Sequence, residues 1–297
     1  MSQPANAQSI PATVLIAAKN EEANIAKCLA SLDAFERIVV VDSHSTDRTA
    51  SIAQASGAET VQFDYRGGYP KKRQWALDSL GITTPWVLLL DADEVVTPEL
   101  SFEIRAAISR ADGPEAYLIT KGFHFLGRRF RFGGFSHAAV LLFQTGKAKF
   151  ERIIVESADA LDMEVHERLF VEGRTQKLRS PLIHEDYKNL ESYLDRHNKY
   201  STWEAKVRSS FLQGRGNDVV QPRLFGSLQE RRRWLKQLAV RTPFEPWLWF
   251  LYHYVIRGGF LEGRRGLIAS RIRSQYISQV RAKIYELGLN NRPSGES

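Results

Sequence analysis

Short apolar runs alternate with helical patterns through the first hundred residues of this 297-residue chain. Buried strands are expected at 13–17, 37–42, 58–63 and 86–90. Amphipathic stretches between the runs predict helices over 21–32, 45–55 and 69–80. Alternation of this kind forms a doubly wound parallel sheet with right-handed crossovers. The sequence therefore predicts an α/β fold for this part of the chain.

Polar side chains follow three of the predicted strands, at 19–21, 42–47 and 91–93. Parallel strands end at one edge of a sheet, and open α/β sheets bind ligands there. Asn20 also stands where it would cap the helix over 21–32. The chain has no G-x-G-x-x-G after its first strand and no G-x-x-x-x-G-K-[ST]. The dinucleotide-binding and P-loop classes are therefore excluded, because no glycine turn brings backbone amides onto phosphates.

Asp91 and Asp93 come directly after the fourth strand, separated by one alanine. Two carboxylates in this place suit Mg²⁺ or Mn²⁺ held between the protein and the phosphates of a substrate. The alternative is helix capping, with Asp93 or Glu94 opening a helix that starts near Thr97. Because three polar strand ends converge on one edge, the ligand site is the favoured interpretation.

The pattern changes after residue 116 to strands and hairpins. Further strands are expected at 117–120, 139–143 and 168–171, and a helix at 189–208. Between the first two strands, 123–135 is rich in Gly, Arg and aromatic residues. This segment is either a flexible loop over the site or an aromatic hairpin. The choice of ligand at the site is expected to depend on side chains within 123–136.

The C-terminal quarter carries the basic charge of the chain. Residues 222–285 contain thirteen Lys and Arg against three Asp and Glu, and the whole chain has a net charge of +7. Within it, 246–256 is apolar, rich in Trp and Tyr, flanked by arginines, and too short to span a bilayer. It is expected to lie in the headgroup region of a membrane, with a buried helix as the alternative. No nucleic-acid recognition module is apparent, so no nucleic-acid partner is expected.

The single cysteine, Cys28, excludes a disulfide framework and any cysteine-rich metal site. The polar N-terminus lacks the apolar region of a secretory signal. Both features favour a cytoplasmic location.

Four motifs, in this order, resemble glycosyltransferase family 2, the inverting nucleotide-sugar transferases of GT-A fold. They are IAAKNE at 16–21, VVVDSHSTD at 39–47, LLDADE at 89–94 and VHE at 165–167. The resemblance covers roughly 12–208 and implies a GT-A-like, doubly wound, mostly parallel sheet with a basic helical C-terminal extension. The predicted parts are a disordered N-terminus at 1–11, a GT-A nucleotide-sugar transferase domain at 12–208, a linker at 209–222 and a basic, aromatic-rich helical membrane-associating region at 223–297.

The resemblance also assigns roles at the site. It implies that Glu21 and Asp42 hold the base and ribose of the nucleotide, that Asp91 contacts the ribose or a metal-bound water, and that Asp93 ligates the metal. The residues expected to bind the nucleotide sugar are Ala17, Asn20, Glu21, Asp42, Ser43, Lys72, Asp91 and Ala92. The expected metal ligands are Asp93, Asp91 and His184. Lys72 is expected to reach the diphosphate, although 71–73 is equally the pattern of a solvated helix start.

Inversion by direct displacement needs a carboxylate that takes the proton of the acceptor hydroxyl. Glu167 in the VHE motif is the predicted catalytic base, and a surface carboxylate on a strand is the alternative. Asp162, Glu185 and Asp186 are the reserve candidates.

The resemblance implies a metal-dependent inverting glycosyltransferase that uses Mg²⁺ or Mn²⁺ and a nucleotide-sugar donor, expected to be UDP-linked. The C-terminal part, with GGFLEG at 258–263, looks like a subgroup that builds bacterial lipopolysaccharide core or exopolysaccharide. This implies a lipid-linked saccharide or polysaccharide acceptor, a peripheral position on the cytoplasmic face of the inner membrane, and contact with anionic lipid through 223–285. A sugar nucleotidyltransferase and a catalytically silent GT-A scaffold that binds a polymer or assembly partner are the alternatives.

Overall fold

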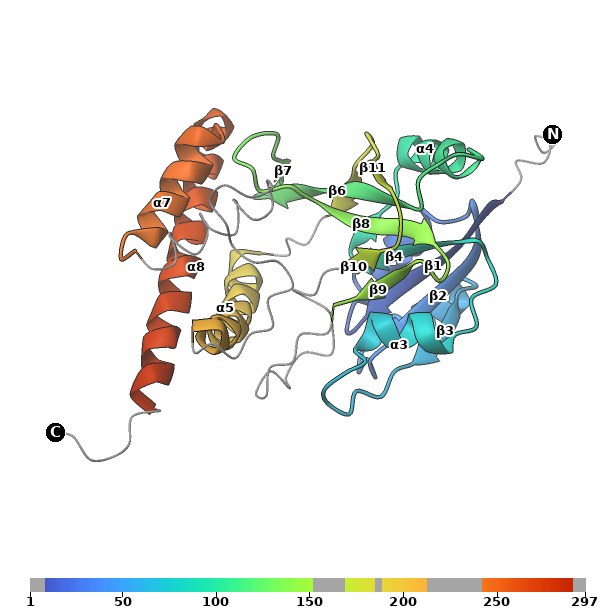
Figure 1. Ribbon diagram of the computed structural model, residues 1–297, viewed down its shortest axis with the longest axis horizontal. Helices are drawn as coiled ribbons and strands as arrows, with labels where there is room; N and C mark the ends of the chain where they lie inside the picture. The colour runs from blue at the N-terminus through green and yellow to red at the C-terminus, as the bar shows by residue number, and fades with distance from the viewer. Residues whose placement is uncertain (1–8, 152–168, 185–188, 213–241, 291–297) are drawn as a thin grey trace. The chain divides into compact units, whose positions relative to one another are not determined.

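The computed structural model describes residues 9–151, 169–184, 189–212 and 242–290 (Figure 1). The chain divides into two compact units. Unit 1 is Met1–Phe123, Ser136–Ile154 and Asp159–Asp186, and unit 2 is His124–Phe135, Val155–Ala158 and Tyr187–Ser297.

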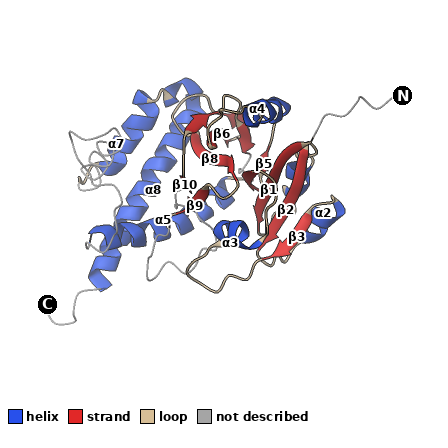
Figure 2. Cartoon of the chain, turned by 45° about the vertical axis from the view of Figure 1, so that its right-hand side comes forward, coloured by secondary structure: helices blue, strands red, loops and turns tan. Residues whose placement is uncertain are grey.

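Unit 1 is built on a mixed, mostly parallel sheet. Its parallel part runs in the order β3 (Glu59–Gln62), β2 (Phe35–Asp42), β1 (Ile10–Ala18) and β4 (Trp86–Asp91). Along the chain, these strands are connected through α1 (Ile25–Leu29), α2 (Thr49–Ala55) and α3 (Lys72–Ser79). Figure 2 labels α2 and α3 beside the sheet. The predicted α/β fold with a mostly parallel sheet is confirmed.

The sheet continues beyond β4 with strands that the sequence placed only in part. β8 (His137–Gln144) is antiparallel to β4 and to β6 (Ala116–Phe125). β12 (Leu182–His184) and β11 (Thr175–Lys177) are parallel to β6, and β5 (Glu94–Val95) is antiparallel to β12. Two remaining strands, β9 (Ala148–Phe150) and β10 (Leu169–Val171), form a separate pair, and α4 (Pro98–Ile108) follows β5.

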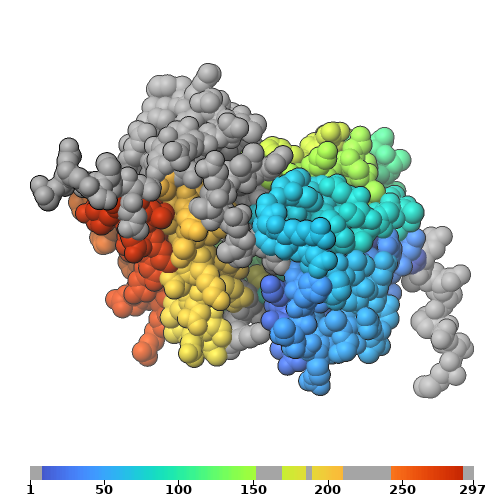
Figure 3. All heavy atoms as spheres, turned by 90° about the horizontal axis from the view of Figure 1, so that it is seen from below, coloured from blue at the N-terminus to red at the C-terminus, as the bar shows by residue number. Residues whose placement is uncertain are grey.

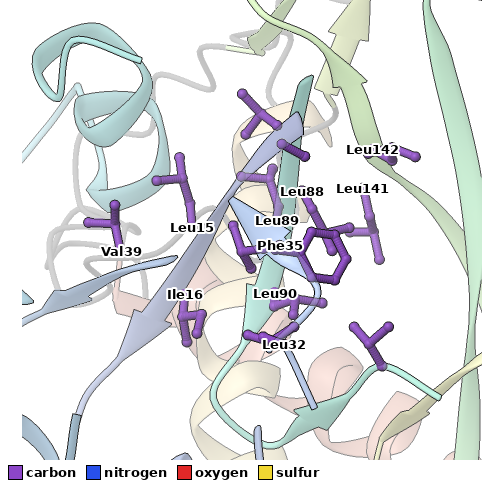
Figure 4. Close-up of a cluster of buried hydrophobic side chains, with 14 of the residues drawn as sticks. Leu15, Ile16, Leu32, Phe35, Val39, Leu88, Leu89, Leu90, Leu141 and Leu142 are labelled. Atoms are coloured by element: carbon purple, nitrogen blue, oxygen red, sulfur yellow. The ribbon is translucent and has the colours of Figure 1, made fainter. Parts of the chain in front are cut away.

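The core of unit 1 lies on both sides of β1 and β4. Both strands are hydrogen-bonded to neighbours on either side, and almost every residue in them is buried. Leu15 and Ile16 belong to one buried cluster with the Leu88–Leu90 run and with Leu141 and Leu142 of β8 (Figure 4). Because both faces of these strands are covered, the sequence shows continuous apolar runs rather than alternation.

The helices of unit 1 begin later than predicted because the polar strand ends form loops that bind one another. Asn20 does not cap a helix: it has a φ of +55°, and its Oδ1 accepts a hydrogen bond from the Thr46 amide at 2.8 Å. Capping by Asp93 or Glu94 is also wrong. Thr97 caps α4, with its hydroxyl accepting from the Leu100 amide at 3.1 Å.

Residues 123–135 form the aromatic hairpin, so the flexible-loop alternative is wrong for this segment. β6 runs to Phe125 and pairs with the short antiparallel strand β7 (Arg128–Arg129). The two residues between them, Leu126 and Gly127, both have positive φ, which is the geometry of tight hairpin turns. Phe130 packs edge-on against Phe125 and Phe135, at ring distances of 6.1 and 5.8 Å.

Unit 2 contains α5 (Leu190–Leu212), α7 (Glu245–Leu251), the π-helix η1 (Tyr252–Ile256), the 3₁₀ turn η2 (Gly259–Glu262) and α8 (Gly263–Asn290). α5 and α8 pack against each other, seen as the yellow and red segments of Figure 3. The Tyr276 hydroxyl donates to Glu204 at 2.5 Å, and the Lys283 ammonium donates to the Asn198 carbonyl at 2.9 Å. Within the described parts of the chain, none of the helices has the length and apolarity to cross a membrane.

The predicted boundary at 208–209 stays a prediction, although α5 runs through it and belongs to unit 2. Most of the predicted linker at 209–222 lies outside the described residues, as do the segment 224–241 and nearly all of the N-terminal segment 1–11.

Replacing Leu88 by Ala is expected to lower the free energy of unfolding by about 2–5 kcal/mol, because Leu88 is fully buried between covered faces. Urea unfolding followed by circular dichroism measures this. Phe102→Ala on α4 is the control, since Phe102 is 73% exposed, and its effect should stay within about 0.5 kcal/mol. Equal losses in both variants would contradict the assigned core.

Candidate functional site

The three polar strand ends lie together at one edge of the sheet in unit 1. Ala17 of β1 is paired with Asp91 of β4, and Ala18 of β1 is paired with Asp42 of β2. The Ser43 amide also donates to the Ala18 carbonyl at 3.1 Å. The register therefore brings the clusters at 19–21, 42–47 and 91–93 to one edge, as the sequence predicts.

The loops after β1 and β2 fix the carboxylates of Asp42 and Glu21. Asp42 is buried and accepts hydrogen bonds from the Ser45 amide and from Gln62 Nε2, both at 3.0 Å. Glu21 accepts from Asn24 Nδ2 at 2.7 Å, and its own amide donates to the Thr49 hydroxyl at 2.7 Å. These bonds hold both acids in defined positions at the end of the sheet.

Ala17, Ser43 and Ala92 are buried beside these acids. The Ser43 hydroxyl has no hydrogen-bond partner in the part of the chain that the structure describes. Buried hydroxyls nearly always have a partner, so this one is available to a ligand.

Asp91 lies in a buried network with Arg73, Lys121 and Glu94. Arg73 donates to Asp91 Oδ1, and the Lys121 ammonium donates to Oδ2 at 2.9 Å. Lys121 is also 2.6 Å from Glu94 Oε1, and the other oxygen of Glu94 accepts from the Asp91 amide at 2.9 Å. Cationic side chains thus engage both oxygens of Asp91.

The network fixes the protonation states of its members. Burial raises the pKa of Asp91, but Arg73 and Lys121 outweigh it and hold that pKa well below its usual range. Burial lowers the pKa of Lys121, and the two carboxylates outweigh this and raise it. The pKa of Glu94 is raised, by burial first and then by the charge of Asp91. Asp91 is therefore ionised and Lys121 charged at neutral pH.

Asp93 and His184 form the pair best suited to a metal ion. β12 pairs with β5 so that His184 lies opposite Glu94, and this brings His184 Nε2 to 3.3 Å from Asp93 Oδ2. A carboxylate oxygen and an imidazole nitrogen together fit Mn²⁺. Within the described ranges, no three His, Cys, Asp or Glu side chains gather to hold a metal. Two protein ligands are enough where diphosphate oxygens and waters complete the coordination.

Lys72 is buried, and its ammonium donates to the Ala18 carbonyl at the end of β1 at 2.9 Å. A solvated helix start is therefore wrong for this residue, while its reach to a diphosphate stays a prediction. Gln74 of the same helix is also buried and accepts from the Phe150 amide at 2.9 Å.

The sequence did not single out Arg73 or Lys121 as partners of Asp91. A lysine within the apolar run of β6 was the available signal for Lys121, because a buried lysine requires an acidic partner. Glu167, Asp162, Glu185 and Asp186 lie outside the described residues, so the position of the base stays a prediction.

Lys121→Met is expected to lower the free energy of unfolding by about 3–5 kcal/mol at neutral pH, because it leaves the buried Glu94 and the partly buried Asp91 with Arg73 as their one cation in this network. Without the ammonium, the folded protein takes up a proton at Glu94, whose pKa is already raised. Stability of the variant therefore falls as pH rises, and the loss should be larger near pH 8 than near pH 5.

Urea unfolding of wild type and variant at both pH values measures this difference. The double variant Lys121→Met/Glu94→Gln should recover part of the loss, since it removes the carboxylate that lost its partner. Equal losses at the two pH values would contradict the assigned charges.

Comparison with known proteins supports one family. Residues 13–140 match the family described as Glycosyl transferase family 2. The lipopolysaccharide core biosynthesis glycosyltransferase LpsC of Rhizobium meliloti is 26% identical to this chain over 96% of each protein. An uncharacterized glycosyltransferase of Rickettsia typhi is 27% identical over 94% of this chain and 88% of its own length.

The mannosyltransferase PcManGT of Pyrobaculum calidifontis, solved in complex with GDP-Man and Mn²⁺, has a similar fold. Its TM-score is 0.53 over 94% of this chain and 88% of that one, at 15% identity. A GT-A-like fold is thus shared across most of the chain, and the family match covers Asp42 and Asp91 at the ends of β2 and β4 and Asp93 in the turn after β4. The match over residues 13–140 therefore identifies a glycosyltransferase family 2 domain in this chain, and together with the named relatives it supports a transferase enzyme.

Proposed function

We propose that this enzyme is a metal-dependent inverting glycosyltransferase in bacterial cell-surface polysaccharide or lipopolysaccharide synthesis. It moves a sugar from a nucleotide-sugar donor to a lipid-linked saccharide or polysaccharide acceptor at the cytoplasmic face of the membrane. The proposed donor is a UDP-sugar. The observation that carries this proposal is the Asp93–His184 pair at the sheet edge that also carries Glu21, Asp42 and Asp91.

The residues of this edge divide the work of binding the donor. Glu21 and Asp42 accept hydrogen bonds from the base and the ribose, and the unpartnered Ser43 hydroxyl lies beside Asp42. Asp93 and His184 would hold Mg²⁺ or Mn²⁺, which as a Lewis acid would neutralise the charge of the nucleoside diphosphate leaving group. Asp91 is kept ionised by Arg73 and Lys121, and in this proposal it contacts the ribose or a metal-bound water.

The acceptor hydroxyl loses its proton to Glu167 in this proposal, as inversion by direct displacement requires a carboxylate on the acceptor side. Support for the acceptor class comes from the relative of Rhizobium meliloti, which is named for lipopolysaccharide core biosynthesis. Support for the metal and for a nucleotide sugar comes from the mannosyltransferase structure, which holds GDP-Man and Mn²⁺. The family match over residues 13–140 favours glycosyl transfer over nucleotidyl transfer and over a silent scaffold.

A thermal-shift screen of nucleotide sugars, with and without Mn²⁺ or Mg²⁺, tests the donor class. A UDP-sugar or GDP-sugar that raises the melting temperature only with metal supports the proposal. Stabilisation by no nucleotide sugar in the presence of either metal would overturn it.

Asp93→Asn is expected to raise the Mn²⁺ concentration for half-maximal donor hydrolysis at least about tenfold, because it removes a charged ligand. His184→Gln should act in the same direction. Asp33→Asn is the matched control, since Asp33 is an exposed acid after the turn that follows α1. An unchanged metal dependence in Asp93→Asn would remove Asp93 from the metal site.

Glu167→Gln is expected to lower kcat by about 10²–10⁴-fold and to leave donor affinity unchanged, because a base acts on the acceptor and not on donor binding. Kinetics of transfer and calorimetric titration of the donor separate the two effects. Glu164→Gln, three residues earlier, is the control. If Glu167→Gln retains wild-type kcat, the base is sought among Asp162, Glu185 and Asp186.

A further inference from the structure

An exposed apolar surface runs along α7, η1 and η2 of unit 2. We call this surface the outer face, and its residues have large apolar side chains that are exposed to solvent. They are Phe244, Trp247, Leu248, Tyr252, Val255, Ile256, Phe260 and Leu261. Trp247 is 64% exposed and Ile256 is 69% exposed. Soluble proteins rarely expose so many large apolar side chains in one stretch, and such patches mark interaction sites.

The spacing of the outer face places it on one side of the helix. Phe244, Leu248, Tyr252 and Ile256 recur every four residues, so their side chains follow one another along the surface. The opposite side is used inside unit 2. Glu245 is buried and bonded to Arg208 at 2.9 Å, and His253 is buried and bonded to the Gly133 carbonyl at 2.7 Å.

The polarity of this helix is therefore the reverse of that of an ordinary surface helix. From Phe244 to Ile256 the only acidic or basic side chains are Glu245 and His253, and both point inward. A surface helix normally turns its charged side to solvent. Here the polar groups bind within the unit, and aromatic and aliphatic side chains face outward.

Exposed arginines adjoin the outer face. We call them the basic rim: Arg129 and Arg131 of the hairpin, and Arg257, Arg264 and Arg265 where η1, η2 and α8 meet. Glu262 connects the two segments, because its Oε1 accepts from the amides of Arg131 and Phe132 at 2.6 and 2.9 Å. Gly133 donates its amide to the Arg257 carbonyl at 2.8 Å.

The rim has no exposed acidic neighbour within its own segments. The acidic residues of 124–135 and 242–285 are Glu245 and Glu262, and both are buried. Apolar aromatic side chains bordered by arginines match the boundary between lipid headgroups and acyl chains of an anionic bilayer. A second copy of this chain fits poorly, because a two-fold interface would bring the basic rims together.

We infer that the outer face inserts into the surface of an anionic membrane, with the basic rim on the lipid headgroups. This inference rests on the proposed function and extends it, because it names the surface by which the enzyme would bind the membrane that contains a lipid-linked acceptor.

The test is flotation of the full-length protein with vesicles of phosphatidylcholine alone and with vesicles that also contain phosphatidylglycerol. The protein is expected to float with the anionic vesicles and to be released by high salt. Trp247→Glu/Ile256→Glu should lower the partition coefficient at least about tenfold. Arg264→Gln/Arg265→Gln should lower it about fivefold for each arginine on anionic vesicles only.

Phe102→Glu is the matched control, because Phe102 is 73% exposed on α4 of unit 1 and should bind vesicles as wild type does. Circular dichroism confirms that each variant is folded. The inference is overturned if wild type does not float, or if the outer-face variant binds vesicles as well as the control does. It is also overturned if sedimentation shows a dimer that the outer-face variant breaks while vesicle binding is unchanged.

Metal-dependent hydrolysis of the nucleotide sugar, measured without vesicles, separates the two proposals. The outer-face variant should keep wild-type hydrolysis. A protein that floats but hydrolyses no donor would contradict the proposed function alone. A protein that hydrolyses the donor but does not float would contradict the outer face alone.

Discussion

The buried ammonium of Lys121 is the interaction on which the arrangement of the site depends. It contacts Asp91 and Glu94 at once, and Arg73 supplies the second cation that balances the two carboxylates. Removing charge from water is costly, and such a cluster is stable only when every member is paired. The end of β4 is thus held by ion pairs as well as by the hydrogen bonds of the sheet. Because Asp93 follows Asp91 by two residues, the same ion pairs restrict the position of Asp93.

The two acids at this strand end look equivalent in the sequence, but different side chains contact them in the structure. Asp91 faces Arg73 and Lys121, whereas Asp93 faces His184. Among the described residues, two cationic side chains hold Asp91, and His184 is the side chain recorded against Asp93. One strand end therefore carries two carboxylates in different electrostatic surroundings.

Much of the fold could be predicted because buried parallel strands leave continuous apolar runs. The strands at 13–17, 37–42 and 86–90 were placed in this way, and the structure pairs them as parallel neighbours. Helix starts were missed, since Asn20 and Thr46 bind each other across two loops and no local pattern encodes that contact. Lys121 was missed for the same reason: its partners Asp91 and Glu94 are about 30 residues away in the chain.

The π-helix Tyr252–Ile256 has a geometric consequence for the helix that it extends. In an α-helix, side chains four residues apart drift around the axis by about 40°, because each residue advances by about 100°. A π turn is wider and advances less per residue, so it turns Ile256 back toward the line of Leu248. The wider turn therefore accommodates one extra residue without moving Ile256 off the side of the helix that carries Leu248. Deleting one residue there would restore an α-helical register in which Ile256 follows Leu248 by seven positions, again within about 20° of the same line.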